Sequence, residues 1–281
     1  MMPCLPPPDF VQERMAINGT ELWVEVRGQG PPLVLVEGMG VGTWMWERQV
    51  DELAEHFRTV TYDLRGSGRS AAPPGPYSIA QMADDLAGVM DALGIERAHV
   101  MGVSFGGMVA QEFALTRPER VERLVLVSTT AGGASHVPMT METLALFMDA
   151  TGTERERVRK KLPLAFTAAW LADEARVERM VDQRLAQPQQ AHAFQAQAAA
   201  GAVFDASQRV SAIRAPTLVL AADADVVVPV ENARYLAARI PGARLRVWEG
   251  LGHQFFVEAA DSFNAEVITF LQSNPGEDGN T

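Results

Sequence analysis

The sequence has very little cysteine and a shortage of positive charge. Its single cysteine, Cys4, excludes an internal disulfide and fits a reducing compartment, so a cytoplasmic location is expected. Lysine and arginine together number 24, against 35 aspartates and glutamates, which gives a formal net charge of −11. Because a nucleic-acid partner normally requires a basic face that displaces counterions from phosphates, we expect no nucleic-acid binding.

Long hydrophobic runs and clustered metal ligands are also missing. The apolar runs are strand-length, well short of the roughly 20 residues of a membrane helix, so no membrane partner is expected. Residues Met1 to Asp9 lack the basic and apolar regions of a secretory signal. The five histidines are scattered, without a second His or a Cys at ligand spacing. We therefore predict neither a catalytic metal nor another cofactor.

The chain is long and apolar enough, with 281 residues and 47% hydrophobic composition, to bury one large core. Asn18-Gly19 lies between two short apolar runs and predicts a hairpin, because both residues tolerate positive φ. Further strands and helices then alternate, which predicts a mostly parallel sheet flanked by helices. The predicted strands are Leu33 to Val36, Thr59 to Tyr62, Ala98 to Val103 and Val121 to Val127, and the predicted helices are Trp44 to Glu55, Ile79 to Leu93 and Gly107 to Thr116.

The alternation stops after the sixth strand. From Val137 to Val203 hardly any strand-like run occurs, and the spacing predicts helices over Thr140 to Met148, Ala175 to Leu185 and Gln189 to Ala200. It resumes with strands at Pro216 to Ala221 and Arg244 to Trp248, and helices at Glu231 to Ile240 and Phe255 to Leu271. The predicted organisation is a flexible arm (1–9), a core (10–136 and 204–272), a helical insertion (137–203) and a disordered tail (273–281).

The segment Gly102-Val103-Ser104-Phe105-Gly106 joins a buried strand to a helix. A Gly-x-Ser-x-Gly turn in this setting is typical of a nucleophile elbow, in which strained backbone angles expose the serine hydroxyl. The pentapeptide is short enough to arise by chance, but the strand before it and the helix after it favour a nucleophile elbow. Because a serine hydroxyl is a poor nucleophile at neutral pH, Ser104 requires a histidine base and an acid that orients it.

Residues at the ends of later strands can supply both partners. His253 lies in a glycine-containing loop after Arg244 to Trp248, and the carboxyl ends of parallel strands carry the functional loops of such sheets. Asp223 and Asp225 both follow the strand that ends at Ala221. We favour Asp225 as the orienting acid, since Asp223 is closer to the strand and suited to binding the backbone.

These motifs, in the order Ser104, Asp225, His253, resemble those of the α/β-hydrolase superfamily. The resemblance spans nearly Phe10 to Leu271 and is strongest in the core. Asp63 to Ser70 is similar to the loop after the family's fourth strand, and we assign this loop no catalytic role. The resemblance implies an α/β-hydrolase fold with residues 137–203 as a helical cap, and it is greatest to the branch of enol-lactonases, esterases and related small-molecule hydrolases.

One position departs from the family pattern. Glu37-Gly38-Met39-Gly40 stands where the family usually has His-Gly. Because the oxyanion donors of such enzymes are backbone N–H groups, Met39 and Phe105 are still expected to supply them. A Glu37 carboxylate facing the pocket would oppose the developing negative charge, so we expect it to turn away and bind the loop backbone.

The sequence thus predicts a serine hydrolase that cleaves an ester or lactone of a small, largely apolar molecule through an acyl-enzyme. The predicted pocket residues are Gly38, Trp44, Met139, Phe147, Phe166 and Trp170. Carbon–carbon bond hydrolysis, perhydrolysis and a ligand-binding receptor with little turnover remain alternatives, and the oligomeric state stays open. The charged run Arg155 to Lys161 is interpreted as a solvated helix face, although an arginine turned inward would suit an anionic lactone.

Overall fold

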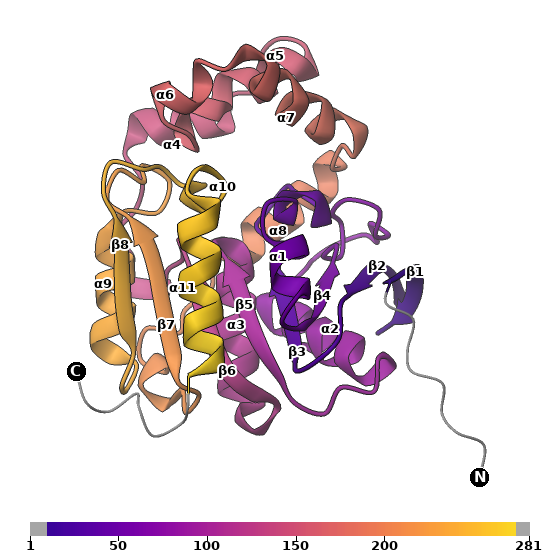
Figure 1. Cartoon of the computed structure of the whole chain (residues 1–281). Helices are drawn as coiled ribbons and strands as arrows, with labels where there is room; N and C mark the ends of the chain where they lie inside the picture. The colour runs from indigo at the N-terminus through magenta and orange to yellow at the C-terminus, as the bar shows by residue number, and fades with distance from the viewer. Residues whose placement is uncertain (1–9, 274–281) are drawn as a thin grey trace.

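The computed structural model describes residues 10–273, which form one eight-stranded sheet with helices on both faces (Figure 1). The strand order is β1-β2-β4-β3-β5-β6-β7-β8. The first three strands in this order pair antiparallel and the rest pair parallel. The strands are β1 (Phe10–Ile17), β2 (Thr20–Arg27), β3 (Pro32–Val36), β4 (Arg58–Tyr62), β5 (Ala98–Val103), β6 (Val121–Val127), β7 (Thr217–Ala222) and β8 (Arg244–Trp248).

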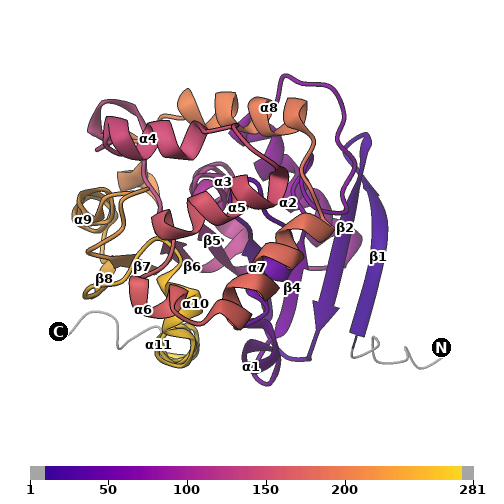
Figure 2. The ribbon, with the colours of Figure 1, turned by 90° about the horizontal axis from the view of Figure 1, so that it is seen from above.

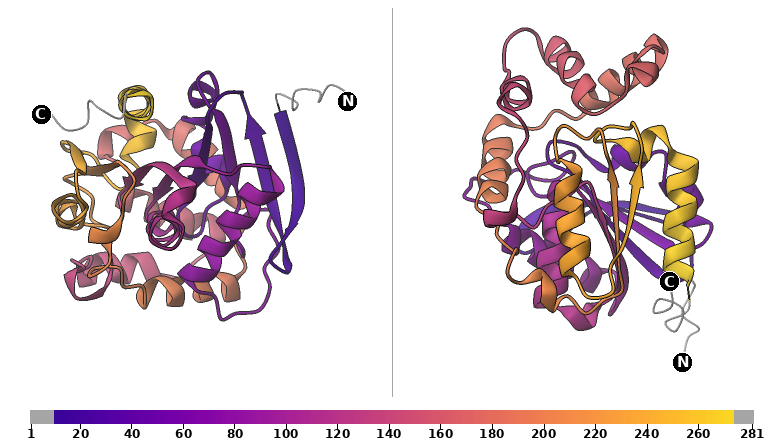
Figure 3. Two further views of the ribbon diagram at one scale, coloured as in Figure 1. Left: turned by 90° about the horizontal axis from the view of Figure 1, so that it is seen from below. Right: turned by 90° about the vertical axis from the view of Figure 1, so that its left-hand side faces the viewer.

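The central strands are apolar on both sides because helices cover both faces of the sheet (Figure 3). In β3, Val34 and Val36 pack on one face and Leu33 and Leu35 on the other, as the two-residue period of a strand requires. The first face lies against α2 (Ile79–Ala92), α3 (Phe105–Thr116) and α9 (Val230–Arg239). The second lies against α1 (Val50–Ala54), α10 (Phe255–Glu258) and α11 (Ala260–Gln272).

Between β6 and β7 the chain forms helices and no strand, as predicted, and these helices lie over one end of the sheet (Figures 1 and 2). They are α4 (Met141–Met148), α5 (Glu154–Lys161), α6 (Ala168–Leu171), α7 (Glu174–Ala186) and α8 (Ala191–Ala202). We call the whole segment from α4 to α8, including the turns between these helices, the cap. Gln254 donates its backbone N–H to Ala165 O at 3.0 Å, so the cap is bonded to the loop that carries His253.

The α/β-hydrolase fold predicted from the sequence is confirmed, but two predicted helices are divided. Trp44 to Glu55 forms the 3₁₀ turn η1 (Thr43–Trp46) and then α1, and Met45 and Trp46 of this turn are buried. Phe255 to Leu271 divides at Ala259, whose φ of −108° and ψ of 38° are not helical, and Phe255 and Phe256 before it are both buried.

The predicted flexible arm, 1–9, and all of the predicted tail except Ser273 lie outside the described residues. The predicted domain boundaries stay predictions. Within residues 10–273, no helix has the length and apolar character needed to cross a membrane.

Candidate active site

Ser104 stands at the junction of β5 and α3 in a strained conformation, with φ 52° and ψ −116°. Its backbone N–H donates to Val127 O at 2.8 Å, and its carbonyl accepts from the Gly107 N–H and from the Thr129 hydroxyl at 2.7 Å. A non-glycine residue holds a positive φ only when its surroundings impose it. The elbow predicted from the pentapeptide is therefore present and anchored to the end of β6.

The glycines around Ser104 are required by close backbone packing. A Cβ on Gly102 would stand 2.3 Å from Gly106 O, and one on Gly106 would stand 2.3 Å from the carbonyls of Val36 and Glu37. No side chain fits at such distances. The strand and helix of the elbow thus approach as closely as the sequence predicted.

Asp225 and His253 are brought together from the ends of β7 and β8. His253 Nδ1 lies 2.8 Å from Asp225 Oδ2, while Asp225 Oδ1 accepts the N–H groups of Val227 and Val228, each at 2.8 Å. Asp223 instead accepts the Gly250 N–H at 2.6 Å. These contacts agree with the sequence-based choice of Asp225 over Asp223. They hold the imidazole in the tautomer that carries its proton on Nδ1.

The end of β6 connects the elbow to the His253 loop. Ser104 is bonded to Val127, and the hydroxyl of the next residue, Ser128, donates to the His253 carbonyl at 3.3 Å. Ser128 itself has a positive φ of 41°. The sequence analysis missed this residue, whose only signal was a serine immediately after a buried strand.

The backbone around Ser104 offers two hydrogen-bond donors. Phe105 is the first residue of α3, where N–H groups have no intrahelical acceptor, and the N–H of Met39 follows Gly38 in the loop after β3. Neither N–H donates to another group within residues 10–273. A Cβ placed on Gly38 would stand 3.8 Å from Ser104 Cβ, so this loop borders the nucleophile. Both donors agree with an oxyanion hole.

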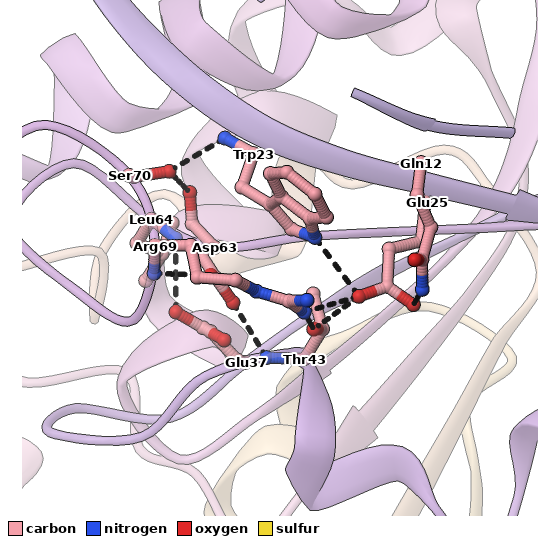
Figure 4. Close-up of polar contacts among 9 residues, drawn as sticks. All are labelled: Gln12, Trp23, Glu25, Glu37, Thr43, Asp63, Leu64, Arg69 and Ser70. Atoms are coloured by element: carbon pink, nitrogen blue, oxygen red, sulfur yellow. Dashed lines mark hydrogen bonds and ion pairs between the residues drawn. The ribbon is translucent and has the colours of Figure 1, made fainter. Parts of the chain in front are cut away.

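Glu37 turns away from Ser104, as expected. It is fully buried, and Oε1 accepts the Leu64 N–H at 2.9 Å, while Oε2 has no hydrogen-bond partner in the described chain. Two other buried carboxylates lie nearby, those of Asp63 and Glu25, with Arg69 as their cation (Figure 4). We call these four residues the carboxylate cluster.

Burial makes the charges of this cluster unequal. Burial, together with the charge of Asp63, raises the pKa of Glu37 well above its ordinary value, and burial also raises the pKa of Asp63. Burial opposes ionisation of Glu25 too, but hydrogen bonds from Trp23, Gln12 and Thr43 outweigh it and lower the pKa of Glu25. Glu37 is therefore the member that most readily keeps its proton.

The predicted pocket residues are placed in different ways. Phe166 and Trp170 stack with ring centroids 3.8 Å apart inside the cap's own hydrophobic cluster. Met139 and Phe147 are half-buried, and Phe147 lies against the Phe194 ring at 6.5 Å. Trp170 and Trp44 line a pocket of about 230 Å³ between the cap and the core.

The charged run of α5 behaves largely as predicted. Arg155 pairs with Glu178 and Asp182 of α7, and Arg159 pairs with Glu174 and Glu178. An arginine that the sequence analysis did not consider, Arg184, is instead turned toward Trp44.

Known proteins resemble this chain in sequence and in structure. Residues 31–260 match the family model for the alpha/beta hydrolase fold. A protein of Azorhizobium caulinodans that carries the name carbamate hydrolase RutD is 34% identical over 89% of this chain and 94% of its own length. The enol-lactonase of Burkholderia xenovorans is 32% identical, with a TM-score of 0.81 over 93% of this chain and all of its own. The meta-cleavage product hydrolase of Pseudomonas fluorescens is 27% identical, with a TM-score of 0.81 over 92% and 96% of the two chains.

The strand order and the family match define the class of this protein as an α/β-hydrolase fold. This chain belongs to the α/β-hydrolase family, since the match covers most of its length and relatives above 30% identity span nearly the whole of it.

Proposed function

We propose that this protein is a serine hydrolase that cleaves a carboxylic ester or lactone of a small molecule through an acyl-enzyme. The observation that carries the proposal is that a strained Ser104 and the Asp225–His253 hydrogen bond of 2.8 Å occur at the same end of the sheet. The similarity to an enol-lactonase supports this bond type. A cytoplasmic location stays part of the prediction.

In the proposed mechanism His253 accepts the Ser104 proton through Nε2 while Ser104 Oγ attacks the substrate carbonyl. Asp225 keeps the imidazole oriented and stabilises the imidazolium. The N–H groups of Met39 and Phe105 bind the oxyanion, and losing one such donor costs on the order of 3 kcal/mol in comparable enzymes. His253 then returns the proton to the leaving oxygen, and water, activated by the same imidazole, releases the acyl group.

Two neighbours favour other bonds for the same triad. The relatives named carbamate hydrolase point to a carbamate carbonyl, and the meta-cleavage product hydrolase points to carbon–carbon cleavage. We favour the ester or lactone because its cleavage requires only a nucleophile, a base and oxyanion donors. The Glu37 carboxylate, which accepts the Leu64 N–H, is not needed as a further acid or base.

The test is a substrate panel with product analysis. Purified protein should hydrolyse 4-nitrophenyl esters and simple lactones, and Ser104→Ala should abolish turnover while leaving the unfolding midpoint close to that of the wild type. Preferential turnover of a carbamate or a ring-cleavage diketone would reassign the bond. Turnover of none of these classes by the wild type would refute the hydrolase proposal.

A further inference from the structure

Arg184 is a cation that α7 places on its buried side. Val177, Val181 and Arg184 follow one another at helical spacing, and both valines belong to the cap's hydrophobic cluster. The Arg184 guanidinium lies 5.6 Å from the centroid of the Trp44 ring, and its buried Nε has no hydrogen-bond partner. Among the described residues, no carboxylate forms an ion pair with it.

The lack of a partner does not reflect a lack of acids on this helix. Glu174, Glu178 and Asp182 recur every four residues on another side of α7, where they pair with Arg155 and Arg159. The acids are thus used on the side that faces α5, and Arg184 is left without one. A half-buried charge whose buried Nε has no partner costs free energy, which makes its presence informative.

Lys161, the last residue of α5, is a second cation of this kind. It is half-buried and forms no hydrogen bond or ion pair within residues 10–273. Burial lowers the pKa of Lys161, and the charges of Arg157 and Arg184 lower it further although Asp149 opposes them. Lys161 ends α5, and the ion pairs of Arg155 and Arg159 pack α5 against α7, the helix that carries Arg184.

The same region holds further unsatisfied polar atoms and adjoins the oxyanion loop. Trp44 Nε1 and Gln187 Oε1 are buried without hydrogen-bond partners. Gln187 Oε1 lies 3.0 Å from the point where a Cβ on Gly42 would stand, so the end of α7 contacts the loop between Gly38 and Trp44. Asp63 also approaches Gly42, but its oxygens accept the N–H groups of Thr43 and Arg69.

We propose that Arg184, with Lys161 and the indole N–H of Trp44, binds a carboxylate of the substrate at the end remote from the scissile carbonyl. A guanidinium suits this ligand because its planar donors match a carboxylate in two parallel hydrogen bonds. The natural substrate is accordingly an anionic ester or lactone, which replaces the largely apolar substrate expected from the sequence. The inference rests on the proposed function, since it names the substrate class of the same site.

The first test compares two substrates that differ only in their far end, mono-4-nitrophenyl adipate and 4-nitrophenyl hexanoate. The wild type should show the higher kcat/KM on the adipate ester. Arg184→Gln should lower kcat/KM for that ester on the order of 10- to 100-fold, mainly through KM, and change hexanoate turnover less than about threefold. Lys161→Gln should act in the same direction with a smaller effect.

Arg155→Gln is the matched control, because it removes an arginine from the paired side of the cap, and it should leave both substrates unaffected. Arg184→Lys keeps the charge and should retain part of the preference if Arg184→Gln is poorly folded. An equal loss on both esters in Arg184→Gln, or a wild type that prefers the hexanoate, would overturn the inference.

A binding measurement separates this inference from the proposed function. Calorimetric titration of adipate into Ser104→Ala requires no chemistry, and binding should weaken at least about tenfold when Arg184→Gln is added. Adipate binding that depends on Arg184 in a protein that hydrolyses no ester would keep the anion site and refute only the hydrolase. Ester hydrolysis together with adipate binding that Arg184→Gln does not weaken would refute the anion site and leave the hydrolase proposal intact.

Discussion

The carboxylate cluster and the Arg184–Lys161 pair adjoin different residues of the loop after β3, Glu37 for the cluster and Trp44 for Arg184, and each holds charge that neighbouring residues do not balance. In the cluster, Glu25, Glu37 and Asp63 share the single cation Arg69. In the cap, neither Arg184 nor Lys161 forms an ion pair within the described chain, although the charge of Asp149 acts on Lys161. The two regions therefore carry imbalances of opposite sign.

Acidic and basic side chains respond differently when burial leaves them without a counter-charge. A buried carboxyl can keep a proton, and the raised pKa of Glu37 shows that it does so over a wider pH range than an exposed one. Burial lowers the pKa of Arg184 to about 10, which still leaves the guanidinium charged at neutral pH. The carboxylate cluster can therefore reduce its negative charge without a ligand. The positive charges of Arg184 and Lys161 are balanced only when an anion binds.

The largest effect is expected at Asp225, which lies outside both regions and is bonded to His253. Asp225→Asn should reduce kcat about 10⁴-fold, because the amide cannot hold His253 in the working tautomer. Asp223→Asn is the control and should cost less than about fivefold in kcat, since Asp223 bonds only the Gly250 N–H. Steady-state kinetics on a 4-nitrophenyl ester compare the two, and a larger loss at Asp223 would reverse the assignment of the acid.

The proton on Glu37 is tested by the pH dependence of stability. Because the folded pKa of Glu37 is raised above its ordinary value of 4.5, the folded protein binds a proton that the unfolded chain releases. Glu37 thus lowers the free energy of unfolding as pH rises above about 4.5, by up to about 1.4 kcal/mol per pH unit, until the folded pKa is passed. Glu37→Gln removes this dependence.

Urea unfolding at pH 5, 6, 7 and 8 measures the effect. The stability of Glu37→Gln relative to the wild type should increase with pH, because the amide imitates the protonated acid and still accepts the Leu64 N–H. Parallel pH profiles for the two proteins would show that Glu37 ionises normally. They would contradict the claim that a carboxyl of the cluster keeps its proton.

Arg184→Met should increase the stability of the ligand-free protein. Methionine fills a similar volume without an unpaired charge, so the free energy of unfolding should rise by about 1 kcal/mol. Arg159→Met, which breaks paired contacts on the α5 side, should lower it or leave it unchanged. Thermal unfolding without added anions compares them, and a destabilised Arg184→Met would indicate a partner that balances Arg184 within the protein.

The smallest effect is expected at Met39. Met39→Ala should change kcat less than about threefold, because the proposed oxyanion donor is the backbone N–H and the substitution retains it. Esterase kinetics check this expectation. A loss comparable to that of a deleted oxyanion donor would assign the role to the side chain.

The parts of the molecule that follow from local constraints could be predicted from the sequence. Gly102 and Gly106 mark a contact that only glycine permits, and the order Ser104, Asp225, His253 places three side chains at strand ends of one parallel sheet. The hairpin at Asn18-Gly19 likewise has positive φ at both residues. In each case the residue type and its immediate neighbours determine the conformation.

The parts that depend on how distant segments pack could not be predicted in the same way. The helical spacing from Val177 to Arg184 was a signal in the sequence, but its meaning required knowing that acids on α7 face α5 and that Trp44 lies under Arg184. Phe166 and Trp170 illustrate the opposite case, because aromatic residues proposed for the pocket stack largely on each other. In both cases the surroundings of the side chain depend on how the cap packs, within itself and against the core.

The central claim, that Ser104 is an activated nucleophile, is tested most directly by labelling with a fluorophosphonate followed by peptide mass spectrometry. The wild type should gain one label, located on Ser104, and Asp225→Asn should react far more slowly. An unlabelled wild type, or a label on a different residue, would contradict the account.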